Sequence, residues 1–112
     1  MSEYIPDNWV VLKIKTDQPS SHFYKVLAGW SGGYLDGDSW RINSGIAKVD
    51  RENKYSPYID FYGYSGSVYR CHKETYGLRM NNAGIYDKMK EQFGDRIEMM
   101  PAETDWMELI DA

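Results

Sequence analysis

The fold is decided first by residues 8–16, whose sequence is NWVVLKIKT. Val10, Leu12 and Ile14 alternate with the two lysines of this stretch. Alternation of apolar and polar side chains is typical of a β-strand that buries one face. We therefore predict a half-buried strand here. The DQPSS segment that follows is expected to turn the chain, because proline cannot donate to a strand ladder.

Four further segments have strand character, because they are rich in β-branched and aromatic residues and are bounded by turn-forming residues. They span residues 22–30, 39–50, 57–64 and 67–73. Gly45 lies inside one of them and predicts a bulge or a close approach of the backbone. Together with the first strand, these segments predict an antiparallel, barrel-like meander of about five strands over residues 8–73.

The pattern changes to a helix at residues 81–94. One face of this helix would carry the apolar side chains Ile85, Met89 and Phe93. Asn81 or Asn82 can cap its start, and Gly94 suits the position just after its end. Because a run of strands precedes a single helix, the predicted fold class is α+β, with one domain over residues 1–112.

The C-terminal segment, residues 95–112, is predicted to be distinct in charge. It holds 1 basic and 6 acidic residues, whereas residues 1–94 hold 12 basic and 11 acidic ones. Within it, residues 96–101 are expected to be extended, and residues 102–112 to form a short acidic helix or a frayed tail. The near-neutral body has no excess of basic residues, so we expect no long nucleic acid as a partner.

Several cellular settings are disfavoured by composition. The single cysteine, Cys71, excludes an internal disulfide and fits a reducing compartment. The first nine residues lack the basic and apolar parts of a signal peptide. No apolar run approaches the roughly 20 residues that a membrane span needs. We therefore expect a cytoplasmic protein without a membrane partner.

The glycine-rich stretch GWSGGYLDGDSWRINSGI, residues 29–46, resembles a ligand loop at first. If Asp36 begins a calcium loop, the sixth position is Arg41 and the twelfth is Ala47, where such a loop needs Gly and Glu. A phosphate loop would need a lysine after the glycines at the start of a helix, and strand-like residues follow instead. We therefore predict neither a metal nor a cofactor here, and interpret the stretch as a long connection between strands.

Catalysis has little support in the sequence. His22, His72 and Cys71 are too few for a structural zinc site. Cys71 and His72 are adjacent on a predicted strand, so they point to opposite faces and cannot act as a nucleophile–base pair. Cys71 is expected to be buried and His72 to lie at the surface or in a hydrogen bond. A small hydrolase that uses Asp36 or Asp38 is a weaker alternative, since no base, nucleophile or metal accompanies these carboxylates.

The remaining polar and aromatic residues suit the binding of a nucleotide. Aromatic rings can stack on a base, Arg can hold phosphate, and Ser and Asn can donate or accept hydrogen bonds. For any single aromatic residue, a place in the core is the more common alternative. The predicted ligand-binding residues are Trp30, Ser31, Tyr34, Trp40, Arg41, Asn43, Ser65, Ser67, Tyr69, Arg79 and Asn82.

Two dense segments carry a resemblance that extends over most of residues 8–93. They are WSGGYLDGDSWRINSGI, residues 30–46, and GYSGSVYRCHKETYGLRMNNAGIY, residues 63–86. They resemble a family of small proteins of T4-like phages and cyanophages, which is itself similar to the viral sponges that sequester cyclic dinucleotides and so block CBASS antiphage signalling. The resemblance implies a homo-oligomer, a tetramer in particular, in the host cytoplasm. It also implies ligand pockets between protomers and binding without turnover.

A second class of function fits the same aromatic residues. The chain could be an interaction module whose aromatic surface docks a host protein. That alternative predicts a 1:1 complex with a host protein and no affinity for nucleotides.

Overall fold

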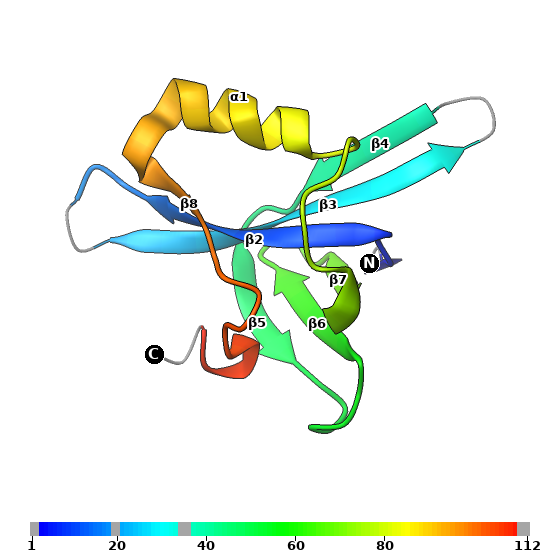
Figure 1. The fold of residues 1–112 in the computed structure, drawn as a ribbon. Coiled ribbons are helices and arrows are strands. Elements are labelled where there is room, and N and C mark those ends of the chain that lie inside the picture. The colour runs from blue at the N-terminus through cyan, green and yellow to red at the C-terminus, as the bar shows by residue number, and fades with distance from the viewer. Residues whose placement is uncertain (1–2, 19–20, 34–36, 110–112) are drawn as a thin grey trace.

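Strands dominate the fold, which is of the mixed α+β class with two four-stranded sheets and one α-helix (Figure 1). The computed structural model describes residues 3–18, 21–33 and 37–109. Helix α1, the sheet that contains β2 and β3, and the sheet that contains β6 and β7 are stacked as three layers in Figure 1. Among the described residues, no helix is long and apolar enough to cross a membrane.

The first sheet has the strand order β4-β3-β2-β8 and is antiparallel throughout. Its strands are β2 (Asn8–Lys15), β3 (His22–Gly33), β4 (Gly37–Ile42) and β8 (Ile97–Met99). The strands predicted at 8–16 and 22–30 are therefore confirmed as neighbours, and Asn8 pairs with Gly29 at one end of the ladder. The extended piece predicted at residues 96–101 is confirmed as β8, which pairs with β2.

The second sheet has the order β1-β7-β6-β5. Its strands are β1 (Glu3–Tyr4), β7 (Val68–His72), β6 (Tyr58–Gly63) and β5 (Ile46–Asp50). β5, β6 and β7 form an antiparallel run, as their sequence predicts, whereas β1 pairs parallel to β7. The short 3-10 helix η1 (Lys73–Thr75) follows β7.

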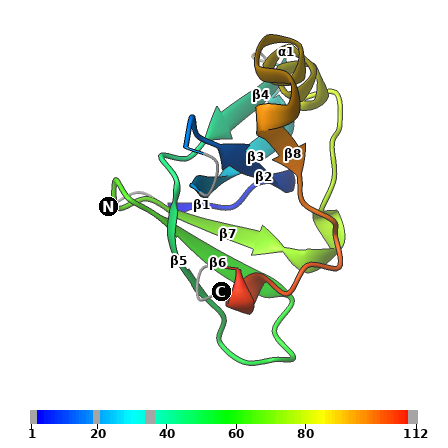
Figure 2. The same ribbon diagram turned by 90° about the vertical axis from the view of Figure 1, so that its left-hand side faces the viewer.

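The prediction of one barrel-like meander is wrong in its topology, because the sheets are separate and not closed into a barrel. Residues 39–50 are not one strand: the chain leaves the first sheet after Ile42 and enters the second at Ile46 (Figure 2). Gly45 lies in this corner with φ +131, a conformation that side-chain-bearing residues rarely adopt, and a Cβ there would lie 2.9 Å from the Tyr64 ring. The close approach of the backbone predicted at Gly45 is thus confirmed, and it lies where the chain passes from one sheet to the other.

Strand β2 is buried on both faces over most of its length, and not on one face as predicted. Trp9 and Val11 face the second sheet, where they join a core that includes Phe61 and Trp106. Val10 and Leu12 face α1 and join a second core. A central strand between two layers needs apolar residues at consecutive positions, and VV at positions 10 and 11 supplies them.

Helix α1 (Ala83–Phe93) confirms the predicted helix, and it ends at Gly94, whose N–H donates to the Lys90 carbonyl. The 3-10 helix η2 (Gly94–Arg96) leads from it to β8. The acidic segment contains another 3-10 helix, η3 (Trp106–Glu108), as the alternative of a short helix predicts. Trp106 and Leu109 are buried in the core between the sheets, so this segment is part of the folded domain.

Candidate ligand-binding site

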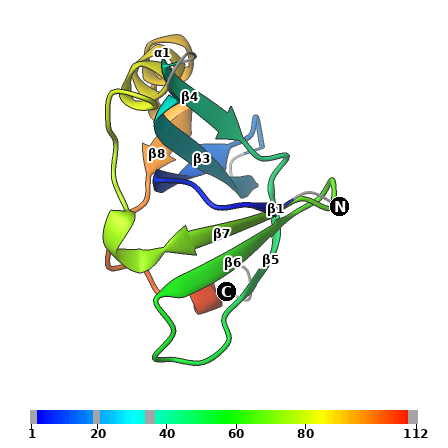
Figure 3. The same ribbon diagram turned by 90° about the vertical axis from the view of Figure 1, so that its right-hand side faces the viewer.

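An open hollow is lined by residues of β1, an edge strand of one sheet, and of β3 and β4, the second of which is an edge strand of the other sheet. Figure 3 shows the two sheets, with β4 above β1 and β7. Its volume is about 360 Å³. Five of the described residues line it: Tyr4, Trp30, Ser39, Trp40 and Arg41. Three of them, Trp30, Trp40 and Arg41, are predicted ligand-binding residues, and the structure brings them together at one place.

The pairing of β3 with β4 determines which side chains reach the hollow. Trp30 pairs with Ser39 and Ala28 pairs with Arg41, so all four lie on the face that looks toward the second sheet. Trp40 belongs to the opposite face of the sheet and is nevertheless one of the lining residues; it is 47% exposed. The hollow therefore combines half-buried aromatic rings with exposed residues of β4.

Trp30 and Tyr4 hold each other in place. The Trp30 Nε1 donates a hydrogen bond to the Ile5 carbonyl at 3.0 Å. The rings of Tyr4 and Trp30 meet edge to face, with centroids 6.2 Å apart and an interplanar angle of 66°. Both rings are half-buried, so they form a wall that is already organised before any ligand binds.

Arg41 supplies the positive charge of the hollow. Its Cζ lies 4.6 Å from the centre of the Tyr4 ring, and its side chain is exposed. Among the described residues Arg41 forms no ion pair. Its guanidinium is stacked on an aromatic face while its N–H groups can still donate, which is the arrangement that binds phosphate or carboxylate well.

Tyr69, a predicted stacking residue, lies beneath the hollow and not in it. It is 2% exposed, and its ring packs against Tyr4 with centroids 5.0 Å apart. Burial raises the pKa of Tyr69 to about 12, and the nearby Arg41 guanidinium opposes this shift. Tyr69 is a neutral support for the Tyr4 ring, and a base cannot stack on it in this chain.

Two predicted asparagines are also buried, and their hydrogen bonds are structural. The Asn43 Oδ1 accepts from the Val26 N–H at 2.9 Å and so fixes the corner between β4 and β5. The Asn82 Oδ1 accepts from the Arg79 N–H at 2.8 Å, and its Nδ2 donates to the Leu27 carbonyl at 3.4 Å. Asn82 occupies the N-cap position of α1, but its side chain makes no capping hydrogen bond.

The predicted serines do not enter the hollow. Ser31 is exposed, but its N–H donates to the Asp7 carboxylate at 2.8 Å and its Oγ accepts from Asn81 at 3.4 Å. Ser65 donates its N–H to Ser44 Oγ at 3.0 Å. Ser67 lies in the same β6–β7 turn, where its carbonyl accepts from the Gly63 N–H.

Four further residues that the sequence analysis singled out lie elsewhere or outside the described part. Arg79 is exposed in the loop before α1 and does not line the hollow. Tyr34 and Asp36 lie outside the described residues, and for Asp38 only the backbone, in β4, is described.

Sequence reasoning missed Tyr4 as a site residue. It lies in a two-residue strand whose parallel pairing with β7 joins distant parts of the chain. Pro6, two residues after Tyr4, does not indicate this pairing. The only usable signal was that Tyr4 is one of ten tyrosines in a chain rich in aromatic residues.

Cys71 and His72, the two reactive side chains that are adjacent in the sequence, are held by packing and by hydrogen bonding. Cys71 is fully buried, which raises the pKa of its thiol, as does the Asp60 carboxylate. This confirms the interior place predicted for it. His72 accepts at Nδ1 from the Glu74 N–H at 3.1 Å, as the alternative of a hydrogen-bonding histidine predicts. Within the described ranges, no three His, Cys, Asp or Glu side chains are grouped closely enough to hold a metal ion.

Comparisons with protein-family models, with curated proteins and with solved structures gave no match. The chemistry of the hollow is therefore the basis for a functional proposal.

Proposed function

We propose that this chain is a non-catalytic viral sponge that binds and sequesters cyclic dinucleotides, and so inhibits CBASS-type antiphage defence. The observation that carries the proposal is the hollow between β1 and β4, where the Arg41 guanidinium stacks on the Tyr4 ring and forms no ion pair among the described residues, and where the 47% exposed Trp40 is also a lining residue. An indole face can stack on a base, and a guanidinium can hold a phosphate with two hydrogen bonds. Ser39 adds an exposed hydroxyl.

The size of the hollow supports a shared site. A volume of about 360 Å³ lies at the lower end of the range of about 300–1,000 Å³ that is usual for ligand pockets. One hollow would hold one nucleotide unit, and the second unit of a cyclic dinucleotide would need a hollow from another copy of the chain. We therefore include a homo-oligomer, and a homotetramer in particular, in the proposal.

Binding without turnover agrees with the groups in the hollow. Among its described lining residues only Ser39 and Tyr4 carry hydroxyl groups, and none is a histidine, carboxylate or lysine that could activate them as a base. Aromatic and guanidinium groups recognise a nucleotide but do not by themselves transfer a proton.

The first test is calorimetric titration with a panel of cyclic di- and trinucleotides, followed by release of the ligand with heat and its chromatography. Saturable binding and recovery of the unaltered ligand are expected. A thermal shift to higher temperature should accompany binding, because a ligand that binds only the folded state stabilises it. Failure of every panel member to bind would remove the proposal, and recovery of an altered ligand would indicate an enzyme.

A pair of variants tests the location of the site. Trp40→Ala should weaken binding roughly 5- to 150-fold, since base–aromatic stacking contributes about 1–3 kcal/mol per base. Tyr55→Ala is the matched control, because Tyr55 is 79% exposed and does not line the hollow. Equal affinities for the two variants would place the ligand elsewhere, provided that circular dichroism shows both to be folded.

Exposed apolar side chains favour a second candidate, an interaction module that docks a host protein. Met80 is 92% exposed, Tyr64 is 70% exposed and Trp40 is 47% exposed. Large apolar residues of this kind are common at protein interfaces. A 1:1 complex with a host protein in pull-down experiments, lost in Tyr64→Ala and without affinity for nucleotides, would favour this candidate over the sponge.

A further inference from the structure

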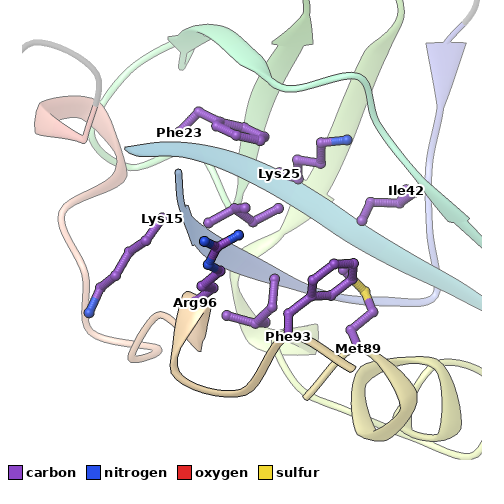
Figure 4. A pocket seen from close by; sticks show the side chains of 9 residues that line it. Lys15, Phe23, Lys25, Ile42, Met89, Phe93 and Arg96 are labelled. Atoms are coloured by element: carbon purple, nitrogen blue, oxygen red, sulfur yellow. The ribbon is translucent and has the colours of Figure 1, made fainter. Parts of the chain in front are cut away.

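A second pocket lies on the other side of the first sheet, beneath the C-terminal end of α1, and has a volume of about 270 Å³. Its walls are apolar side chains of the sheet and of the helix: Ile14, Phe23, Ile42, Met89, Phe93 and Ile97. Figure 4 shows Met89 and Phe93 on the helix side and Phe23 on the side of β3. This pocket shares no lining residue with the hollow between β1 and β4.

Lys25 breaks the apolar pattern of this face. It pairs with Leu12, and the alternation along β3 places it on the same face as Phe23 and Leu27. The side chain is half-buried, its Nζ lies 5.7 Å from the centre of the Phe23 ring, and no ion pair of Lys25 occurs among the described residues. The stem of Lys25 therefore packs against the apolar wall while its ammonium group can still meet an anion.

The other charged side chains that line the pocket are also positive, and the charge of one of them is paired with a carboxylate. Arg96 lines the pocket and forms an ion pair with Asp17, and Lys15 lies at the rim, where its side chain extends away from the others (Figure 4). No carboxylate belongs to the described lining. Lys90 donates to the Gly94 and Ile97 carbonyls at 3.2 and 2.8 Å, so the negative end of α1 is compensated.

We propose that this pocket binds a small amphiphilic anion, a medium-chain alkyl carboxylate, with the alkyl chain between the sheet and α1 and the carboxylate on Lys25. The apolar walls match the alkyl chain, and the unpaired ammonium matches the carboxylate. A volume just below the usual range for ligand pockets excludes a long-chain lipid. The inference is independent of the cyclic dinucleotide proposal, because the two sites use different residues.

The test is titration of the full chain, labelled at its Ile and Met methyl groups, with decanoate below its micellar concentration. Saturable shifts are expected for Ile14, Ile42, Ile97 and Met89. The methyl groups of Ile59, buried between the sheets, and of Met80, exposed in a loop, should not move. Decanol, which keeps the alkyl chain but lacks the charge, should bind more weakly than decanoate.

Lys25→Gln should weaken decanoate binding about fivefold, which corresponds to about 1 kcal/mol for a partly exposed ion pair. Lys48→Gln is the matched control, since Lys48 also lies over an aromatic ring, at 5.5 Å from the centre of Tyr62, but on the other sheet. Unchanged affinity in Lys25→Gln, or equal affinity for decanol and decanoate, would overturn the proposal. Intermolecular contacts from the pocket methyl groups to a second copy of the chain would also overturn it, because the pocket would then be an interface.

Discussion

Gly29→Ala is expected to be strongly destabilising although it adds only a methyl group. Gly29 lies in β3, and a Cβ at this position would be 2.1 Å from Oδ1 and 2.4 Å from Cγ of Asn81. Asn81 is 5% exposed and exchanges two hydrogen bonds with the fully buried Asn8, at 3.0 and 2.7 Å. The methyl group and the amide cannot occupy the same space, so the Asn81 side chain must leave.

The cost follows from the hydrogen bonds that are lost. Each contributes about 0.5–1.5 kcal/mol, and a buried acceptor left without a partner costs a further 1–3 kcal/mol or so. Asn8 would keep the hydrogen bond from its Nδ2 to the Gly77 carbonyl at 3.2 Å. Its Oδ1, however, would lose the hydrogen bond that it accepts from Asn81. The sum is about 2–6 kcal/mol, a large part of the roughly 5–15 kcal/mol that stabilises a typical domain.

Urea unfolding followed by tryptophan fluorescence measures this loss, and two further variants make the test specific. In an Asn81→Ala background the amide is absent, so Gly29→Ala should then change the free energy of unfolding by less than about 0.5 kcal/mol. Gly84→Ala, in α1 with nothing within 4 Å of the added Cβ, should be stabilising by about 0.5–1 kcal/mol. A loss below about 1 kcal/mol for Gly29→Ala, or the same loss in both backgrounds, would refute the reasoning.

Three other changes test the core and its charges. Tyr76→Phe removes a donor to the Met100 carbonyl and an acceptor for the Val11 N–H, so urea unfolding should show a loss of about 1–3 kcal/mol. Burial raises the pKa of Tyr76 from 10.0 to about 12, so the neutral side chain stabilises the fold below pH 10, and this contribution is lost as the pH rises toward 12. The loss of stability at alkaline pH should therefore be shallower in Tyr76→Phe. Trp106→Ala should cost about 3–5 kcal/mol in the same assay, and a smaller effect would mean that the acidic segment is not part of the core. Burial raises the pKa of Asp60, so the native state binds its proton more tightly than the unfolded state, and stability falls as the pH rises past 3.8. Asp60→Asn should lack this fall when the urea midpoints of unfolding are compared across acidic pH. An unchanged fall in the variant would contradict the role of Asp60.

The strands could be predicted from the sequence because alternation is a local property. Residues 8–16 and 57–64 carry it in a few neighbouring positions. The division into two sheets could not be predicted in the same way. Residues 39–50 keep strand character through the corner, and Gly45 marks an irregularity without indicating that the chain changes sheet. The partner of a strand is a long-range property, which alternation alone does not specify.

The candidate site was predicted in part for the same reason. Trp30, Trp40 and Arg41 are close in the sequence and meet across one hairpin. Tyr4 joins them only through the parallel pairing of β1 with β7, which no local pattern indicates. The Asn82 amide bonds the Arg79 N–H and the Leu27 carbonyl, and residue type alone does not separate an asparagine that reads a base from one that satisfies buried backbone groups.

Strand β4 shows how one short segment can serve both proposed sites. Consecutive side chains of a strand point to opposite faces, so Arg41 reaches the hollow between the sheets while Ile42 reaches the pocket beneath α1. A shift of one residue in the pairing of β4 with β3 would exchange these two side chains and place a guanidinium among Met89 and Ile97. The burial cost of that charge opposes the shift, so the same alternation that separates the sites also fixes the register that both require.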